Sequence, residues 1–207
     1  SFDANGGGVS ECERRVREGS SVGDLPKPQR YCYDFDGWFT AADGGDAISS
    51  ETEVADNVTY YAHWKVSQYT VVFDENGGTG GMTVVQDYGT ALSAPMVSRK
   101  GYTFTGWSPA VPATVPAGGA TYMAQWKVNR YAVAFDANDG EGSITNQQDY
   151  ASEIVPPEVS RTGYTFAGWL PEVEASVPAS NIVYTAQWTA NKYTVSFDAN
   201  GGAGGKM

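Results

Sequence analysis

The stretch Gly-Tyr-Thr-Phe-Thr-Gly-Trp, residues 101–107, decides the fold of this chain because it recurs. A near copy at 163–169 lies 62 residues further on, and a looser copy, 32–38, lies upstream. Two other phrases flank each copy: Phe-Asp-x-Asn comes before it and a closing Tyr-x-Ala-x-Trp comes after it. Phrases that recur in a fixed order are the signature of one folding unit copied in tandem.

The spacing between the copies is constant. The closing tryptophans, Trp64, Trp126 and Trp188, are 62 residues apart, and each precedes the next Phe-Asp-x-Asn phrase by nine residues. The connections between units are four residues long and contain no glycine, so we expect a semi-rigid file of units rather than freely tethered ones.

The period sets the predicted domain boundaries. The predicted domains are 1–66, in which the first strand is cut short and one turn is longer, then 67–128, 129–190, and the first strand of an incomplete fourth unit in 191–207.

Alternating apolar residues predict strands rather than helices. Tyr69, Val71 and Phe73 occupy every second position, which is typical of a strand with one buried face, and the closing phrase alternates in the same way. The central stretch alternates until Trp107, where a bulge or strand end would break the pattern. Residues 11–18 resemble a short helix, but the matching segments of the other units are poor helix sequences, so a strand is favoured there. The chain is therefore predicted to be mostly β.

Units of about 60 residues are near the lower limit at which one core is stable without help. Aromatic residues make up 13% of the chain, and each buried ring removes a large apolar area from water. We therefore expect the repeated aromatic positions to form the cores. The predicted core residues are Phe73, Tyr102, Phe104, Trp107, Trp126, Phe135, Tyr164, Phe166, Trp169 and Trp188.

Charge and hydropathy exclude several partners. The net charge of −11 opposes binding to nucleic acid or to anionic membranes, and no apolar run reaches the roughly 20 residues of a membrane span. Residues 1–7 are repeated without change at 196–202, so both ends fall inside the repeated motif. We expect a monomeric piece of a longer polypeptide, with no nucleic acid partner and no membrane insertion.

The three phrases together resemble the internalin-type B-repeat, also called the Listeria-Bacteroides repeat. The resemblance covers essentially the whole chain. It implies tandem small β-grasp-like domains, with the ubiquitin-type helix reduced or replaced. From the constant, short junctions we expect these domains to be arranged as an elongated rod. Cys32 departs from the pattern, since the other units have glycine there, and Asp139 replaces the first glycine after Asn.

The same resemblance implies a function and a location. It implies a non-catalytic stalk or spacer in a bacterial protein that is secreted or anchored at the cell surface. The alternative is an adhesin module that binds a host or cell-surface protein or a glycan, through exposed strand edges or the turn at 40–50. Neither role needs a cofactor.

The two cysteines, Cys12 and Cys32, both lie in the first unit. Alignment of the units places Cys12 at the position of Met82, on the second strand, and Cys32 at the start of the central strand. A disulfide between them would close a loop of about 20 residues and stabilise a small domain by roughly 3 kcal/mol. Two buried free thiols, or a redox or metal role, are the alternatives; a metal site would need more Cys or His ligands than the chain offers.

No other constellation predicts catalysis or metal binding. His63 is the sole histidine, so no catalytic triad can be built around it. The stretch 136–147 has acidic residues but not the spacing of a calcium loop, and the glycines at 77–81 lack the Lys-Ser/Thr of a phosphate loop. Glu172 and Glu174 are interpreted as residues of a solvated loop. We expect no enzyme activity, and no catalytic, cofactor-binding or metal residues.

The segment 193–207 repeats the first strand of a unit without the rest of that unit. We expect it to be mobile or to pair with the edge of another chain.

Overall fold

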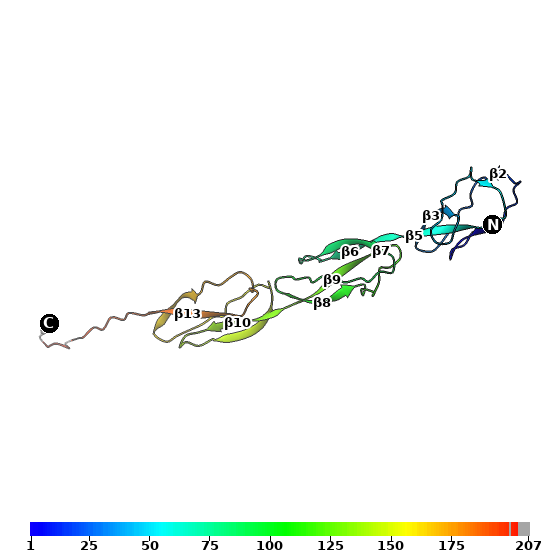
Figure 1. Ribbon diagram of the computed structural model, residues 1–207. Helices are drawn as coiled ribbons and strands as arrows, with labels where there is room; N and C mark the ends of the chain where they lie inside the picture. The colour runs from blue at the N-terminus through cyan, green and yellow to red at the C-terminus, as the bar shows by residue number, and fades with distance from the viewer. Residues whose placement is uncertain (199, 203–207) are drawn as a thin grey trace. The chain divides into compact units, whose positions relative to one another are not determined.

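The computed structural model describes residues 1–198 and 200–202, and every regular element in these residues is a strand (Figure 1). The predicted fourth-unit segment, 191–207, falls partly outside the described residues. The strands are β1 (Phe2–Asp3), β2 (Ser20–Ser21), β3 (Tyr33–Phe39), β4 (Glu53–Val54), β5 (Tyr60–Val66), β6 (Gln68–Asp74), β7 (Met82–Asp87), β8 (Tyr102–Ser108), β9 (Ala120–Val128), β10 (Arg130–Asp136), β11 (Ile144–Asp149), β12 (Tyr164–Leu170) and β13 (Ile182–Ala190).

The strands form several small sheets that follow one another along the chain. Two four-stranded sheets have the orders β7-β6-β9-β8 and β11-β10-β13-β12; a three-stranded sheet, β1-β5-β3, and a ribbon, β2-β4, precede them. In each larger sheet the strand that ends in Phe-Asp is parallel to the closing strand. The same plan thus recurs with the sequence period, and the mostly β prediction is confirmed.

The chain divides into two compact units. One consists of Ser1–Val97 with Gly106–Gln125, and the other of Ser98–Thr105 with Trp126 and the residues after it. The first unit contains two clusters of buried side chains, centred on Phe2 and on Phe73, and the second contains one, centred on Phe135.

The buried clusters have matching members. The cluster around Phe73 also contains Val71, Leu92, Val115 and Tyr122. The cluster around Phe135 repeats it position for position with Val133, Ile154, Val177 and Tyr184. The tyrosine of each closing phrase is thus a core residue that the predicted core set lacks, although its alternation with a buried alanine could have revealed it.

Three predicted core residues are exposed. Phe104 is 37% exposed, Tyr164 38% and Phe166 39%, so the prediction that they are buried is wrong. The reason is their position in the sheet. Phe166 is paired with Trp188, beyond the buried Tyr184 and Ala186 of β13, so its ring covers the end of the core instead of filling it.

The other predicted core residues are placed as follows. Phe73 and Phe135 are buried within their clusters. Trp107 and Trp169 are partly buried and pack against those clusters. The remaining three are half-buried: Tyr102, Trp126 and Trp188. A register shift between Phe166 and Gly168 lets both Phe166 and Trp169 lie opposite core-side residues of β13.

Residues 10–19 of the first repeat form neither a helix nor a strand, apart from the approach to β2 at Ser20. The second strand expected there is therefore absent, although β7 and β11 form at the matching places in the later repeats. Charged residues replace the apolar ones on this segment, and β1 offers only two residues as a pairing partner.

The Phe-Asp-x-Asn phrase is a turn device. The Asp136 carboxylate accepts a hydrogen bond from the Asn138 backbone amide at 2.9 Å, and Asn138 has a φ of 49°. Its side-chain amide donates to the Ala186 carbonyl at 3.0 Å, which ties the turn to β13. Asn5 and Asn76 make the matching contacts with Ala62 and Ala124. Asn is thus required both for its left-handed backbone and for its amide.

We expect Asn138→Ala to lower the free energy of unfolding by about 2 kcal/mol, half from backbone strain and half from the lost hydrogen bond. Asn138→Gly tolerates the backbone conformation and should lose about 1 kcal/mol. Urea-induced unfolding measures both variants. Equal losses for alanine and glycine would show that the backbone conformation contributes nothing.

Candidate functional site

The histidine and the acidic residues that the structure describes are not gathered into a site. His63 stacks on Phe39 with ring centroids 3.9 Å apart, and its Nε2 lies 3.0 Å from the Ala41 carbonyl. Glu172 and Glu174 are exposed. Asp139, in the acidic stretch 136–147, forms an ion pair with Arg161 at 3.5 Å. Among residues 1–198 and 200–202, no group of three or more His, Cys, Asp or Glu is placed to hold a metal ion.

Cys12 and Cys32 are free thiols, so the predicted disulfide is wrong. Phe2 donates a backbone hydrogen bond to the Cys12 carbonyl and pairs with Tyr60 at the start of β5, whereas the Cys32 carbonyl accepts from Ser67, just past the end of β5. Seven residues of strand separate these points by roughly 23 Å. A disulfide requires Cα atoms within about 7 Å, so the two thiols cannot meet.

The two cysteines differ in exposure to solvent. Cys12 is exposed, and Cys32 is 8% exposed. The alternative of two buried thiols therefore holds for Cys32 alone.

The junctions between repeats are the most regular polar feature of the chain. At the second junction Asn129 donates its backbone amide to the Gly101 carbonyl at 2.9 Å, and its own carbonyl accepts from Tyr150 at 2.9 Å. At the first junction Ser67 makes the same two contacts, with Cys32 at 3.0 Å and Tyr88 at 2.9 Å. One connector residue thus bonds to the repeat before it and to the repeat after it.

A turn prepares each junction. Tyr33, Tyr102 and Tyr164 each donate a backbone hydrogen bond to the arginine three residues earlier, at 3.1 Å. The third residue of each turn has a left-handed backbone: φ is 60° at Cys32, 77° at Gly101 and 81° at Gly163. This geometry explains why glycine begins the repeated stretch and why cysteine can replace it only under strain.

The arginine of each turn also lies over the tyrosine ring. The guanidinium carbon is 3.9 Å from the ring centroid in the Arg30–Tyr33 pair, 4.1 Å in Arg99–Tyr102 and 4.2 Å in Arg161–Tyr164. These distances are those of cation–π contacts, which stabilise the turn from one side.

Tyrosine rings close the junctions from the other side. The Tyr150 ring lies against Gly101, where a Cβ atom would overlap it, and meets Tyr102 edge-on at 5.9 Å. At the first junction Tyr88 meets Tyr31 at 5.9 Å and Tyr69 at 6.4 Å, both edge-on. Aromatic edge contacts of this kind add to the apolar area that the rings bury.

The first junction contains a titratable cluster. The hydrogen-bonding interaction with the Cys32 side chain raises the pKa of Tyr31 above the usual 10.0, and the same interaction raises the pKa of Tyr69. The folded protein therefore holds these two protons more tightly than the unfolded chain does. The resulting stability is fully present below pH 10 and is lost as the pH rises through the raised pKa values.

We expect Cys32→Ala to lower the pKa of Tyr31 and of Tyr69 toward the usual value, because the hydrogen bond to the thiol is the main cause of each raised pKa. Tyrosine ring resonances followed by NMR from pH 8 to pH 12 measure each pKa separately. Identical Tyr31 and Tyr69 titrations in the two proteins would contradict the assignment.

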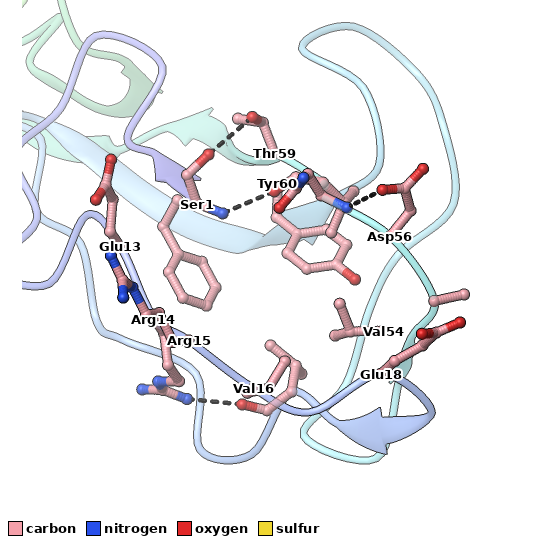
Figure 2. Close-up of a pocket in the computed structure, with 15 residues that line it drawn as sticks. Ser1, Glu13, Arg14, Arg15, Val16, Glu18, Val54, Asp56, Thr59 and Tyr60 are labelled. Atoms are coloured by element: carbon pink, nitrogen blue, oxygen red, sulfur yellow. Dashed lines mark hydrogen bonds between the residues drawn. The ribbon is translucent and has the colours of Figure 1, made fainter.

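A cavity of about 790 Å³ opens beside the first residue (Figure 2). Val54 and Tyr60 line one wall and the segment 13–16 lines the other, with Ser1 at one end. In that second wall the Arg14 guanidinium lies 5.6 Å from the Phe2 ring, donates to the carbonyls of Val22 and Asp24, and pairs with Glu11 at 2.6 Å. This interaction lowers the pKa of Glu11.

Small β units, repeated in tandem and joined by the same connector contacts, define a tandem-repeat β protein. The chain belongs to the Listeria-Bacteroides repeat domain family, whose model matches residues 1–63, 69–122 and 131–189. The family resemblance of the sequence is thus confirmed.

The relatives of this chain include proteins of two bacteria. A protein of Evansella cellulosilytica named as a Gly-rich membrane protein is 32% identical over 98% of this chain and 26% of its own length. A second protein of that organism, named as a membrane protein, is 31% identical over 97% of this chain and 33% of its own. Internalin H of Listeria monocytogenes is 32% identical over 59% of this chain and 25% of its own.

The chain thus spans a quarter to a third of the length of these relatives. No solved structure matches the chain. Across residues 1–198 and 200–202 there is no helix with the length and apolarity needed to cross a membrane.

Proposed function

We propose that the chain is a non-catalytic structural module, a stalk or spacer within a bacterial protein that is secreted or anchored at the cell surface. The observation that carries this proposal is the repeated junction. Ser67 and Asn129 each bond to the turn of the preceding repeat and to the tyrosine of the following one. A connection held from both sides resists bending better than a free linker does.

The strands support the same proposal. One residue separates β5 from β6 and one separates β9 from β10, so the chain passes from each repeat to the next almost without leaving a strand. The proposed domains are 1–66, 67–128 and 129–190, each a small β-grasp-like fold, arranged as an elongated rod. The names of the relatives, two membrane proteins and internalin H, support a place outside the cell.

Small-angle X-ray scattering tests the proposed rod. A compact globule of 207 residues has a radius of gyration of about 17 Å. The proposed stalk requires a radius of gyration well above that of the globule, about 17 Å. It also requires a large maximum dimension with a narrow distribution. A radius near that of the globule would overturn the proposal.

A matched variant tests the junctions as the cause of stiffness. An insertion of five residues, all Gly or Ser, directly after Asn129 would let its bond with Gly101 and its bond with Tyr150 move apart. The insertion leaves the buried cluster of each repeat unchanged. The stalk then predicts a broader distribution of maximum dimensions for the variant than for the parent chain. The same insertion in the exposed turn after Gly44, away from both junctions, is the control.

A further inference from the structure

The turn of the Phe-Asp-x-Asn phrase brings a chemically reactive pair into the second repeat. Asparagine is followed there by glycine, as Asn76-Gly77, whereas the third repeat has Asn138-Asp139. In an unfolded chain, asparagine before glycine deamidates readily, because the next backbone nitrogen attacks the side-chain amide carbon and glycine has no Cβ to hinder the attack. The second repeat therefore contains a pair whose reactivity depends on how the fold holds it.

The folded backbone keeps the two reacting atoms apart. The Gly78 amide donates to the Glu75 carbonyl at 3.0 Å and closes the turn. The central residues of this turn have a φ of 47° at Asn76 and 78° at Gly77. These are angles of a type I′ turn, in which ψ of the first central residue is about 30°. At that ψ the Cβ of an L-residue lies nearly trans to the next backbone nitrogen, so the amide carbon of Asn76 cannot approach the Gly77 nitrogen.

Hydrogen bonds hold the side chain of Asn76 as well. Its Nδ2 donates to the Ala124 carbonyl of β9 at 3.0 Å, and its backbone amide donates to the Asp74 carboxylate at 2.8 Å. Ala124 is fully buried, so the side chain is anchored to the sheet. Rotation toward the Gly77 nitrogen would break the bond to Ala124. The reaction thus requires that the repeat open first.

We propose that Asn76 is a site of deamidation that the fold blocks and that opening of the second repeat exposes. The Gly77 nitrogen forms a bond to Asn76 Cγ, the bond from Cγ to Nδ2 breaks, and Nδ2 takes the Gly77 amide proton and leaves as ammonia. One water molecule then opens the cyclic imide at either carbonyl, which gives aspartate or isoaspartate. Asn76 is exposed to solvent, and water is the only co-reactant. This inference does not depend on the proposed stalk.

The product is a permanent record of opening. A carboxylate has no N–H to donate, so it cannot bond the Ala124 carbonyl, and two acceptors would face each other there. Isoaspartate also adds a methylene group to the main chain between residues 76 and 77, which a four-residue turn does not accommodate. A modified second repeat therefore opens more readily than an unmodified one.

The third repeat supplies a matched control. Asn138 has a φ of 49°, and the Gly140 amide donates to the Ala137 carbonyl at 3.0 Å in the same kind of turn. The next residue is Asp139, whose Cβ and carboxylate hinder attack by its own nitrogen. Asp139 has a φ of 64°, which glycine adopts readily, so Asp139→Gly should create a second reactive pair in an intact turn.

Peptide mapping by mass spectrometry measures aspartate and isoaspartate at residues 76 and 138. The 207-residue chain is incubated at one pH, folded in buffer and unfolded in guanidinium chloride. In denaturant we expect Asn76 to convert about tenfold faster than Asn138, and Asp139→Gly to raise the Asn138 rate to that of Asn76. In buffer we expect Asn76 to convert at least about tenfold more slowly than in denaturant. Equal Asn76 rates in the folded and unfolded chains overturn the proposal, as do equal rates of Asn76 and Asn138 in the unfolded parent.

Two core variants test opening as the cause. Val71→Ala truncates a fully buried side chain of the second repeat, and Val133→Ala truncates its counterpart in the third. In buffer, Val71→Ala should raise the Asn76 rate about tenfold, because a destabilised repeat opens more often. Val133 lies in the other compact unit, so Val133→Ala should leave that rate within about twofold of the parent. Equal or reversed effects of the two variants would contradict the proposal.

A second measurement covers the case in which Val71→Ala does not fold. In the parent chain, denaturant below the unfolding midpoint should raise the Asn76 rate in step with hydrogen exchange of the β6 amides. An Asn76 rate that stays constant while those amides exchange faster would show that opening of the repeat does not control the reaction.

Discussion

Replacing Phe135 with alanine is expected to lower the free energy of unfolding by about 3–5 kcal/mol. The ring is 2% exposed and lies between Trp169, edge-on at 4.9 Å, and Tyr184, stacked at 5.1 Å. A cluster this small has no other large side chain that could move in, so the cavity would remain. Urea-induced unfolding followed by tryptophan fluorescence measures the loss.

Phe166→Ala is the matched control. It removes the same side chain from the same repeat, but from a position that is 39% exposed at the end of the core. The expected loss is about 1–2 kcal/mol, because less apolar area returns to water and the two tryptophan edges remain partly covered. Equal losses for the two variants would show that the buried cluster is not the source of stability in this repeat.

Hydrogen exchange of Phe135→Ala adds a local readout. Amides of β10 and β13 should lose protection, whereas those of β6, which lies in the other compact unit, should keep theirs. Loss of protection throughout the chain would contradict separate cores for the repeats.

Much of the fold can be predicted from the sequence because buried and exposed residues alternate along each strand. The pairs Tyr122 and Ala124, and Tyr184 and Ala186, alternate with exposed or half-buried neighbours, and all four are buried. The turn at Phe-Asp-x-Asn can be predicted equally well, since the left-handed backbone and the side-chain hydrogen bond both require Asn. Such features depend on residues close in sequence or in adjacent strands.

The extent of burial could not be read in the same way. Phe104 and Phe166 share the alternation of true core residues, but the unit is so small that its aromatic row runs past the buried cluster. The disulfide prediction failed for a related reason. Alignment placed Cys12 on a second strand that does not form and Cys32 at the start of the central strand, and it carried no information about which ends of β5 these two residues lie near.

The contacts at the junctions could not be predicted from the sequence pattern at all. Gly101 and Tyr150 are both visible as repeated positions, but they belong to different repeats and are 49 residues apart. Periodicity aligns equivalent residues; it does not show which residues of one repeat meet which residues of the next. The contact between Gly101 and Tyr150 is therefore the feature of the proposed stalk that most needs a direct test.

Gly101→Ala is expected to lower the free energy of unfolding by about 2–4 kcal/mol, from a left-handed alanine and from overlap with the Tyr150 ring. The backbone φ is 77°, and the new methyl group would meet the ring itself rather than a movable chain end. The ring must therefore leave its place, which opens the junction around Asn129.

Gly163→Ala separates the two causes. Gly163 has nearly the same φ, 81°, and the same place in its turn, but no described atom lies within 4 Å of the point that an alanine methyl group would occupy. About 1 kcal/mol of backbone strain is therefore all that is expected. Gly101→Ala should also lengthen the tail of the distance distribution in scattering, and Gly163→Ala should not. If the two variants lose equal stability and scatter alike, Tyr150 does not hold the second junction closed, and any stiffness of the proposed stalk must come from the hydrogen bonds of Ser67 and Asn129 alone.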